Sequence, residues 1–237
     1  MAKPLPGKNL PGKLTGYVNP FIGTDGHGHT FPGATYPFGM MQLSPDTRLS
    51  GWDGCSGYHY SDSLIYGFSH THLSGTGCED YCDILVMPVV GHSGGVIDRE
   101  LYKSPFSHQN ESASPGYYKV RLDNGDIVAE LTSGRRAGMH RYTYTHFPDK
   151  PQIIIDLTHR DPLLDSGLEI VDDHTVKGFR RSSSWAKDQI VYFYMQFSRP
   201  IISQKADNKK ALLTFSPDES GKIVVKTAIS SVSEENA

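Results

Sequence analysis

The chain has 237 residues, with 23 lysines and arginines against 26 aspartates and glutamates, which gives a net charge of −3. This length allows one large domain or two small ones, and the charge balance offers no basic surface of the kind that binds nucleic acid. The hydrophobic content of 37% is too high for a disordered chain. Because no apolar run approaches the roughly 18 residues of a membrane helix, we expect a folded protein with neither nucleic-acid nor membrane partners.

Residues 1–16 are rich in glycine, proline and lysine and contain no apolar stretch of the roughly 7–15 residues that a signal peptide needs. We expect this segment to be a flexible tail, either native after processing or left from cloning. The 24 glycines and 15 prolines of the chain favour short strands joined by ordered loops over long helices. The odd set of Cys55, Cys78 and Cys82 excludes a disulfide scaffold, since at most one bridge can form.

Chemistry-bearing residues concentrate between residues 21 and 95, which hold 14 of the 24 glycines and 6 of the 11 histidines. Two H-x-H pairs occur there, His27 with His29 and His70 with His72. On a strand, such spacing points both imidazoles to one face, where two pairs can bind a divalent metal. The glycines around the first pair favour a loop instead, in which the histidines form hydrogen bonds to the backbone or to a polyol ligand.

Residues 51–60 (GWDGCSGYHY) form a second candidate, a glycine-rich loop that contains Trp52 and Tyr58. Flat aromatic rings suit the apolar C–H faces of a sugar, and the carboxylate of Asp53 can accept hydrogen bonds from hydroxyl groups. The alternative is that the tryptophan folds back onto the core.

Residues 74–83 (SGTGCEDYCD) form a third candidate. The G-x-G element has no lysine and no preceding parallel strand, which argues against nucleotide binding. The spacing of Cys78 and Cys82 differs from the C-x-x-C of redox and zinc motifs.

A fourth candidate is a set of seven acidic residues, but no two of them stand out as the acid and base of a glycosidase. These acids are Glu79, Asp80, Asp83, Asp161, Asp165, Asp172 and Asp173.

The second half of the chain shows the alternation of β-strands, and we expect a β meander with no long helix. Asn124-Gly125 predicts a hairpin between residues 117–122 and 127–132, because both turn residues tolerate positive φ. Further strands are predicted at residues 139–146, 153–155, 189–198 and 223–229, the second of these buried on both faces. Finally, Ser231 and Glu234 fit a capping box, which predicts that a helix begins near the end of this sequence.

Six segments of the first hundred residues closely resemble the N-terminal region of glycoside hydrolase family 92, the exo-acting α-mannosidases. They are residues 17–24 (YVNPFIGT), 27–35 (HGHTFPGAT), 37–40 (PFGM), 42–46 (QLSPD), 57–62 (GYHYSD) and 65–78 (IYGFSHTHLSGTGC). The resemblance is strongest over residues 17–90 and extends over nearly the whole chain. One departure is Cys82, where the family pattern leads us to expect a small residue such as glycine; a bridge from Cys78 to Cys82 is conceivable.

The resemblance implies an all-β fold, a large antiparallel β-sandwich (supersandwich) with long ordered loops near the N-terminus. It divides the chain into the tail at 1–16, the sandwich domain at 17–231 and, at 232–237, the start of a linker helix to an (α/α)6 catalytic domain. It also implies calcium-dependent hydrolysis of terminal α-linked mannose with inversion. The general acid, the general base and the calcium ligands belong to the helical domain, so that no catalytic residue and no metal ligand is expected in this chain.

By resemblance, the sandwich forms one wall of the mannose pocket, and we expect its isolated form to be inactive. The substrate-binding residues implied are Trp52, Asp53, His29, Thr30, Phe31, Gly77, Cys78 and Asp80. The expected partners are mannose-containing glycans and the helical domain, and the family context implies a periplasmic or secreted protein. Two other functions stay open, namely a free-standing carbohydrate-binding module that uses the Trp52 loop and a small metal enzyme built on the H-x-H pairs.

Overall fold

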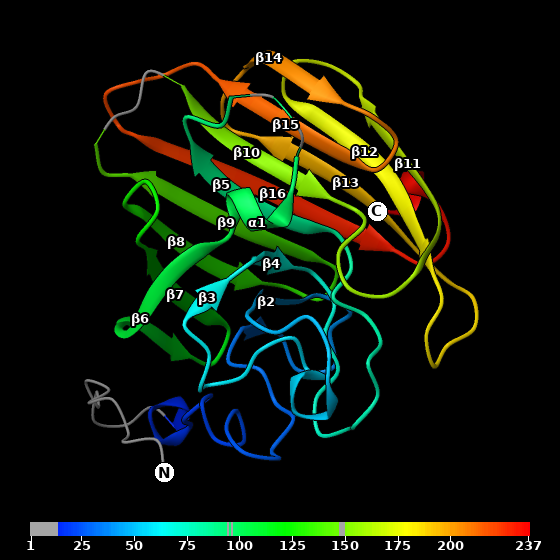
Figure 1. Ribbon diagram of the computed structural model, residues 1–237. Helices are drawn as coiled ribbons and strands as arrows, with labels where there is room; N and C mark the ends of the chain where they lie inside the picture. The colour runs from blue at the N-terminus through cyan, green and yellow to red at the C-terminus, as the bar shows by residue number, and fades with distance from the viewer. Residues whose placement is uncertain (1–13, 94, 96, 147–149) are drawn as a thin grey trace.

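A computed structural model describes residues 14–93, 95, 97–146 and 150–237 of the chain. In these residues two antiparallel sheets lie face to face (Figure 1), which confirms the predicted all-β sandwich. Most of the expected tail lies outside the described residues. Its last part, from Leu14, belongs to a short 3-10 helix, η1 (Leu14–Tyr17). No helix in the described part of the chain is long and apolar enough to span a membrane.

The smaller sheet has seven strands in the order β1-β2-β4-β5-β10-β15-β14. Their bounds are β1 Ala34–Thr35, β2 Gln42–Asp46, β4 Gly67–Ser69, β5 Leu85–Val90, β10 Pro151–Asp156, β15 Lys210–Phe215 and β14 Ile201–Ala206. All six residues of β10 are buried, as the run of isoleucines predicts for a strand covered on both faces. This strand therefore lies at the centre of the sandwich, between β5 and β15.

The larger sheet has nine strands in the order β11-β12-β13-β16-β9-β8-β7-β6-β3. Their bounds are β11 Leu163–Ile170, β12 Thr175–Ser182, β13 Gln189–Phe197, β16 Lys222–Ser230, β9 Ala137–Tyr144, β8 Ile127–Ser133, β7 Tyr117–Leu122, β6 Ser104–Ser114 and β3 Leu64–Ile65. Alternate residues of β13 face the core, among them Val191, Phe193 and Met195, as the period of two predicts. The three remaining short helices are η2 Trp52–Gly54, α1 Arg99–Tyr102 and η3 Glu234–Asn236.

The predicted meander is interrupted twice. The chain crosses to the smaller sheet as β10 and returns to the larger one as β11, and it crosses again as β14 and β15 before it returns as β16. Strand β16 then pairs with β9 on one side and with β13 on the other. Alternation along a strand identifies its buried face, but pairing between strands far apart in sequence depends on the whole core, so the sequence pattern did not reveal these crossings.

Two local predictions are shifted by one or two residues. The hairpin between β7 and β8 is confirmed, but its left-handed residues are Gly125, with φ of 75°, and Asp126, with φ of 50°. Asn124 instead donates its side-chain amide to the carbonyl of Lys103 over 2.9 Å. At the C-terminal end, the residue before η3 is Ser233, so the predicted capping serine, Ser231, lies too early in the chain.

Candidate functional site

The candidate residues lie in the loops that precede β5, at one end of the sandwich (Figure 1). Strands in this segment are short, and several residues other than glycine take the left-handed conformation, among them His29, Tyr81 and Cys82. Such strained positions persist only where the surrounding contacts enforce them, and they gather at functional sites. The loops are therefore defined by specific contacts, and those contacts identify what each candidate residue does.

Trp52 stands on the surface with its ring against the backbone of Gly77. Its side chain is 62% exposed. A Cβ added at Gly77 would lie 2.1 Å from Cζ3 of the ring, so only glycine leaves room for the tryptophan. The imidazole of His29 meets the ring edge-on, with centroids 4.7 Å apart and planes at 79°. The sequence alternative, a tryptophan folded onto the core, does not hold, because the ring packs on a loop glycine and the residue stays largely open to solvent.

Asp53 lies beside this tryptophan as a hydrogen-bond acceptor. Nδ1 of His27 lies 2.6 Å from Oδ1 of Asp53, and Nε2 of His29 lies 3.6 Å from the same oxygen. The hydrogen bond from His27 is the main reason that the pKa of Asp53 falls below its ordinary value. The carboxylate is therefore charged at neutral pH and is oriented by the first H-x-H pair.

Two charged side chains from the strands and loops that follow β5 hold the Trp52 loop in place. The guanidinium of Arg160 donates to the carbonyls of Arg48 and Gly54 over 2.7 and 2.6 Å. Further along the loop, the hydroxyl of Tyr58 donates to the buried carboxylate of Glu111 over 2.8 Å. The tryptophan consequently projects from a rigid support.

Thr30, Phe31 and Cys78 flank this centre. The hydroxyl of Thr30 donates to the carbonyl of Ile22 over 2.9 Å, and the ring of Phe31 packs on His72 with centroids 5.0 Å apart. Cys78 is half-buried, and all three cysteines are free, so the conceivable bridge from Cys78 to Cys82 is not formed. These three residues shape the surroundings of Trp52, and their polar groups serve the loops themselves.

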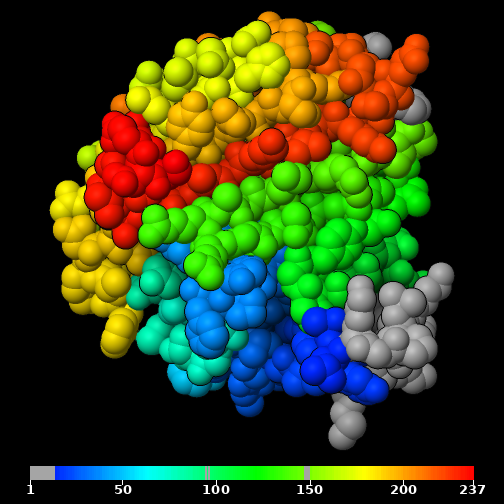
Figure 2. Space-filling model, turned by 180° about the vertical axis from the view of Figure 1, so that it is seen from behind, coloured from blue at the N-terminus to red at the C-terminus, as the bar shows by residue number. Residues whose placement is uncertain are grey.

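Asp80, which the resemblance places among the substrate-binding residues, is bonded to the backbone of another loop. It is 4% exposed, and its two carboxylate oxygens accept from the backbone N–H groups of Trp185 and Ala186 over 3.0 and 2.9 Å. Ser184 donates its hydroxyl to the carbonyl of Glu79 over 2.7 Å, which adds a third bond between the same two segments. The loop between β12 and β13 is thereby fixed beside residues 77–80, and Figure 2 shows it projecting next to that segment.

This loop carries the second tryptophan of the chain, Trp185, which is 76% exposed. Sequence reasoning missed it. The signal was available, because residues 182–187 (SSSWAK) place a tryptophan in a serine-rich turn between two strands, the same pattern that singled out Trp52. The two tryptophans of the chain are thus held at either end of one short segment, residues 77–80.

The two H-x-H pairs do not form a joint metal site in the described residues, where Asp46, His72 and Cys82 are the group that could hold an ion. His70 takes part in a neutral relay between the sheets. Nδ1 of His70 donates to the carbonyl of Ile84, Nε2 of His140 donates to Nε2 of His70, and the hydroxyl of Tyr142 donates to Nδ1 of His140. Every polar atom in this relay is satisfied with uncharged imidazoles, and burial lowers the pKa of His70 to about 4.

The acids that the sequence offered for hydrolysis are used structurally where they are buried. Asp83 forms an ion pair with the fully buried Arg180. Burial raises the pKa of Asp161 to about 7, and this carboxyl lies among the same groups in the interior. A sugar bound at the surface loops cannot reach either of them.

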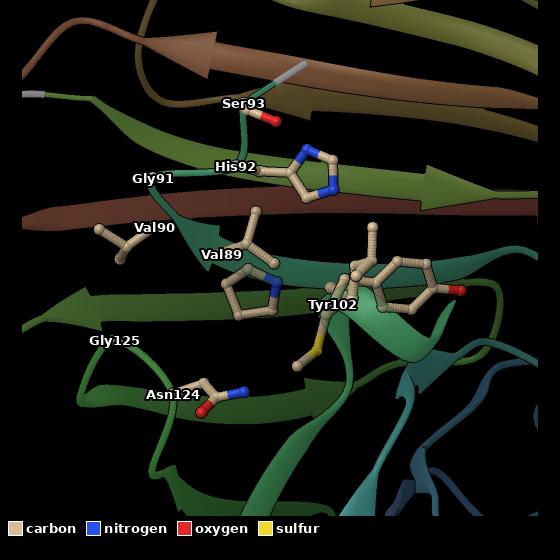
Figure 3. A pocket seen from close by; sticks show the side chains of 11 residues that line it. Val89, Val90, Gly91, His92, Ser93, Tyr102, Asn124 and Gly125 are labelled. Carbon is tan, nitrogen blue, oxygen red and sulfur yellow. The ribbon is translucent and has the colours of Figure 1, made fainter. Parts of the chain in front are cut away.

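A pocket of about 450 Å³ lies elsewhere, between the end of β5, α1 and the β7–β8 turn (Figure 3). Its lining includes Val89, His92, Tyr102 and Asn124 but no aspartate, glutamate, lysine or arginine. The hydroxyl of Tyr102 already donates to Asp156 over 2.8 Å. This pocket has no carboxyl group for acid–base chemistry, and the candidate residues lie outside it.

Comparisons with known proteins point to one family. Residues 17–230 match the glycosyl hydrolase family 92 N-terminal domain. The family GH92 α-mannosidase BT3965 from Bacteroides thetaiotaomicron is 38% identical with a TM-score of 0.85, over 94% of this chain and 34% of that chain. The inverting mannosidase BT2199 from the same species is 26% identical with a TM-score of 0.80, over 96% of this chain and 33% of that chain.

A curated relative from the fungus Arthroderma benhamiae, named an uncharacterized secreted glycosidase, is 29% identical over 181 residues. The match spans 70% of this chain and 22% of that protein. The chain therefore spans about a third of the length of the solved relatives and less of the curated one.

Proposed function

Because the chain belongs to glycosyl hydrolase family 92, as its N-terminal domain, we propose that it forms one wall of the mannose-binding pocket of an inverting exo-α-mannosidase. Solved relatives support the substrate class. BT3965 is named an α-mannosidase and has been solved with mannoimidazole, and BT2199 is named an inverting mannosidase. The proposal transfers that substrate, terminal α-linked mannose of glycans such as N-glycans, to the protein that contains this domain.

The observation that carries the proposal is the supported, solvent-facing ring of Trp52. The ring packs against Gly77 and is nearly perpendicular to the ring of His29, and 62% of the residue is exposed. An immobilised aromatic ring offers an apolar platform for the C–H face of a pyranose at little cost in conformational entropy. The charged Asp53 beside it supplies an acceptor for sugar hydroxyls.

The remaining candidate residues support this platform. Gly77 leaves the space in which the Trp52 ring packs, and Thr30, Phe31 and Cys78 lie in the loops around this ring. We assign Asp80 to positioning, because both of its carboxylate oxygens are used by the backbone of the Trp185 loop.

The chemical step is assigned to a helical partner domain. Inversion needs a general acid and a general base about 6.5–9.5 Å apart across the sugar. In the described residues near Trp52, Asp80 is held by the backbone of the Trp185 loop and Asp53 is a charged acceptor oriented by His27, so these two acids do not form such a pair. We propose that the partner docks over the loop end, where Tyr17, Ile22 and Phe38 expose apolar side chains. Phe38 is fully exposed on a left-handed backbone, a combination that suits a contact with another surface.

Calcium, which the family implies, does not fit the donors around Trp52. This ion takes six to eight oxygen ligands. Of the two candidate carboxylates beside Trp52, Asp80 has both oxygens bonded to backbone N–H groups, and Asp53 has one oxygen bonded to His27, so the two together fall far short of that number. We therefore propose that the calcium ligands lie mainly in the helical domain. A periplasmic or secreted location is proposed from the family context, with the secreted fungal relative as support.

The proposal is tested by assaying hydrolysis of an aryl α-mannoside by the chain alone and by the chain joined to a family 92 helical domain. We expect no turnover from the chain alone and turnover from the joined protein. Trp52→Ala should lower kcat/KM of the joined protein at least about tenfold, a loss equivalent to 1.4 kcal/mol. The control Tyr117→Phe removes a hydroxyl that donates to Glu130 on the neighbouring strand β8. Neither residue belongs to the proposed site, so this variant should leave kcat/KM unchanged. Turnover by the chain alone, abolished by replacing one of its own acids, would overturn the assignment.

A further inference from the structure

A buried group of metal-binding side chains lies behind the Trp52 loop and has no part in the proposed sugar site. One ligand atom from each of Asp46, His72 and Cys82 lies within 4.8 Å of the other two. Asp46 ends β2, His72 follows β4, and Cys82 lies in the loop that leads into β5. The side chains of Asp46 and His72 are fully buried, and Cys82 has no exposed surface.

The hydrogen bonds of His72 leave one ring nitrogen facing the carboxylate. Nδ1 lies 2.7 Å from the carbonyl of Gln42, which can only accept, so Nδ1 carries a proton. Nε2 lies 2.8 Å from Oδ1 of Asp46, which is also an acceptor. A neutral imidazole would therefore place a lone pair against a carboxylate oxygen. The hydroxyl of Ser69 lies 3.1 Å from the same nitrogen and can donate to it. The carboxylate oxygen and the ring nitrogen still face each other as two acceptors, and a cation shared by both atoms would satisfy them.

The second oxygen of the Asp46 carboxylate also faces a histidine nitrogen. Nε2 of His159 lies 3.0 Å from Oδ2 of Asp46, within ion-pair range. Neither atom makes a hydrogen bond of acceptable geometry, although both are buried. Unsatisfied polar atoms on residues this deeply buried are costly and call for a partner. A second imidazole donor is thus aimed at the same group.

The donor set identifies the class of ion. Thiolate, imidazole and carboxylate together are the ligands of zinc, whereas calcium and magnesium prefer oxygen alone. The hydrogen bond from Nδ1 of His72 to a backbone carbonyl is the contact that commonly orients a zinc-bound histidine. Gly57 leaves the group its space, since a Cβ there would lie 2.3 Å from Oδ1 of Asp46 and 2.9 Å from Sγ of Cys82.

We propose that Asp46, His72 and Cys82 bind one structural zinc ion, with His159 as a further donor on the second carboxylate oxygen. Binding displaces the proton of the Cys82 thiol to solvent, while Nε2 of His72 offers its lone pair to the ion. The ion would join β2, the loop after β4 and the loop that carries Cys78 and Asp80. It would thereby stiffen the support of the Trp52 and Trp185 loops from within.

The site is tested on the 237-residue chain, which is purified without a metal-affinity column. Any bound ion is removed under denaturing conditions, and the chain is then refolded with either zinc or cobalt. We expect one zinc per chain by elemental analysis. The cobalt form should show the visible bands of a tetrahedral ion and the near-ultraviolet band of a cobalt–thiolate bond.

Cys82→Gly is the decisive variant, because the left-handed backbone at this position, with φ of 59°, suits glycine and should preserve the fold. This variant should lose the thiolate band and retain less than one zinc per chain, while the control Cys78→Ser keeps both. Unchanged native circular dichroism shows that the loss is one of ligation.

Two results would overturn the site. One is the absence of stoichiometric zinc and cobalt from the refolded chain, which would leave Ser69, His72 and Asp46 as a buried hydrogen-bonded group. The other is full zinc content and an unchanged thiolate band in Cys82→Gly, which would place the metal elsewhere. Neither result bears on the proposed sugar site, since the zinc measurements use no sugar.

Discussion

The loop segment of residues 17–84 and the strand segment of residues 104–230 are held in place by different forces. In the strand segment, long strands bury alternate side chains in one core. In the loop segment strands are short, and five of the seven described non-glycine residues with positive φ fall there. The strand segment is thus specified mainly by apolar burial, and the loop segment by polar contacts with it.

Those contacts are few and mostly buried. Arg160 holds the Trp52 loop, Glu111 holds Tyr58, and Arg180 holds the segment that contains Asp83. In each case a charged side chain beyond residue 104 forms a hydrogen bond or ion pair with the loop segment. Losing one such contact should therefore disturb the candidate site while leaving the apolar core in place.

The largest effect is expected for Arg180→Met. The guanidinium of Arg180 pairs with Asp83 and donates to the carbonyls of Leu157, His159 and Asp161. Removing it leaves a buried carboxylate unpaired, which should cost about 3–5 kcal/mol of unfolding free energy in a denaturant titration. The neighbouring Arg181, whose ion pair with Asp188 is exposed, is the matched control.

Arg181→Ala should change the unfolding free energy by less than about 1 kcal/mol. Equal losses for the two arginines would contradict the view that buried polar contacts, and not surface ion pairs, hold the loop segment.

A smaller and local effect is expected for Asp80→Ala. The N–H groups of Trp185 and Ala186 would lose their acceptor. Hydrogen bonds to a charged group contribute about 1.5–3 kcal/mol, so amide hydrogen exchange at these two positions should accelerate about 10-fold to 100-fold.

Glu79→Ala is the matched control. Glu79 accepts from Ser184 through its backbone carbonyl, and the substitution leaves that carbonyl in place. Exchange at Trp185 should stay slow in that variant. If Asp80→Ala also leaves exchange slow, the Trp185 loop is held by something other than this carboxylate.

The smallest effect is a pH dependence at His108. Its hydrogen bond to Glu111 raises its pKa above the ordinary value of 6.5. A raised pKa stabilises the fold fully below pH 6.5, and this contribution disappears as the pH rises through the folded-state value. Between these two values, stability should fall by less than about 1 kcal/mol, because the imidazole is partly exposed. In His108→Gln this decline should be absent, and an identical pH profile would show that Glu111 is not coupled to His108.

About half of the strands in the strand segment were predictable from the sequence, whereas β6, β11, β12, β14 and β15 were not. Period-two alternation located β7, β8, β9, β13 and β16, and the isoleucine run identified β10 as doubly buried. The crossing of β10 to the other sheet and the insertion of β16 between β9 and β13 were not predictable from local pattern. Pairing partners far apart in sequence are selected by the complete core.

The candidate site was predictable only in its most exposed part. The glycine-rich turn around Trp52 singled out this tryptophan but left open whether it folds onto the core, and the structure places its exposed ring against Gly77. The clamp between Asp80 and the Trp185 loop joins residues 105 positions apart, which no local pattern reveals. The same holds for Asp46, His72 and Cys82, since spacing rules search for metal ligands that are close in sequence.

The most direct measurement for the central claim is calorimetric titration with mannose and an α-linked mannobiose, with and without calcium. It compares the 237-residue chain, the chain joined to a family 92 helical domain, and Trp52→Ala in both forms. The account predicts binding by the joined protein that is weakened by Trp52→Ala, and no binding by the chain alone. Millimolar or tighter binding by the chain alone, lost in Trp52→Ala, would contradict a pocket completed by a partner and would identify a self-sufficient carbohydrate-binding module.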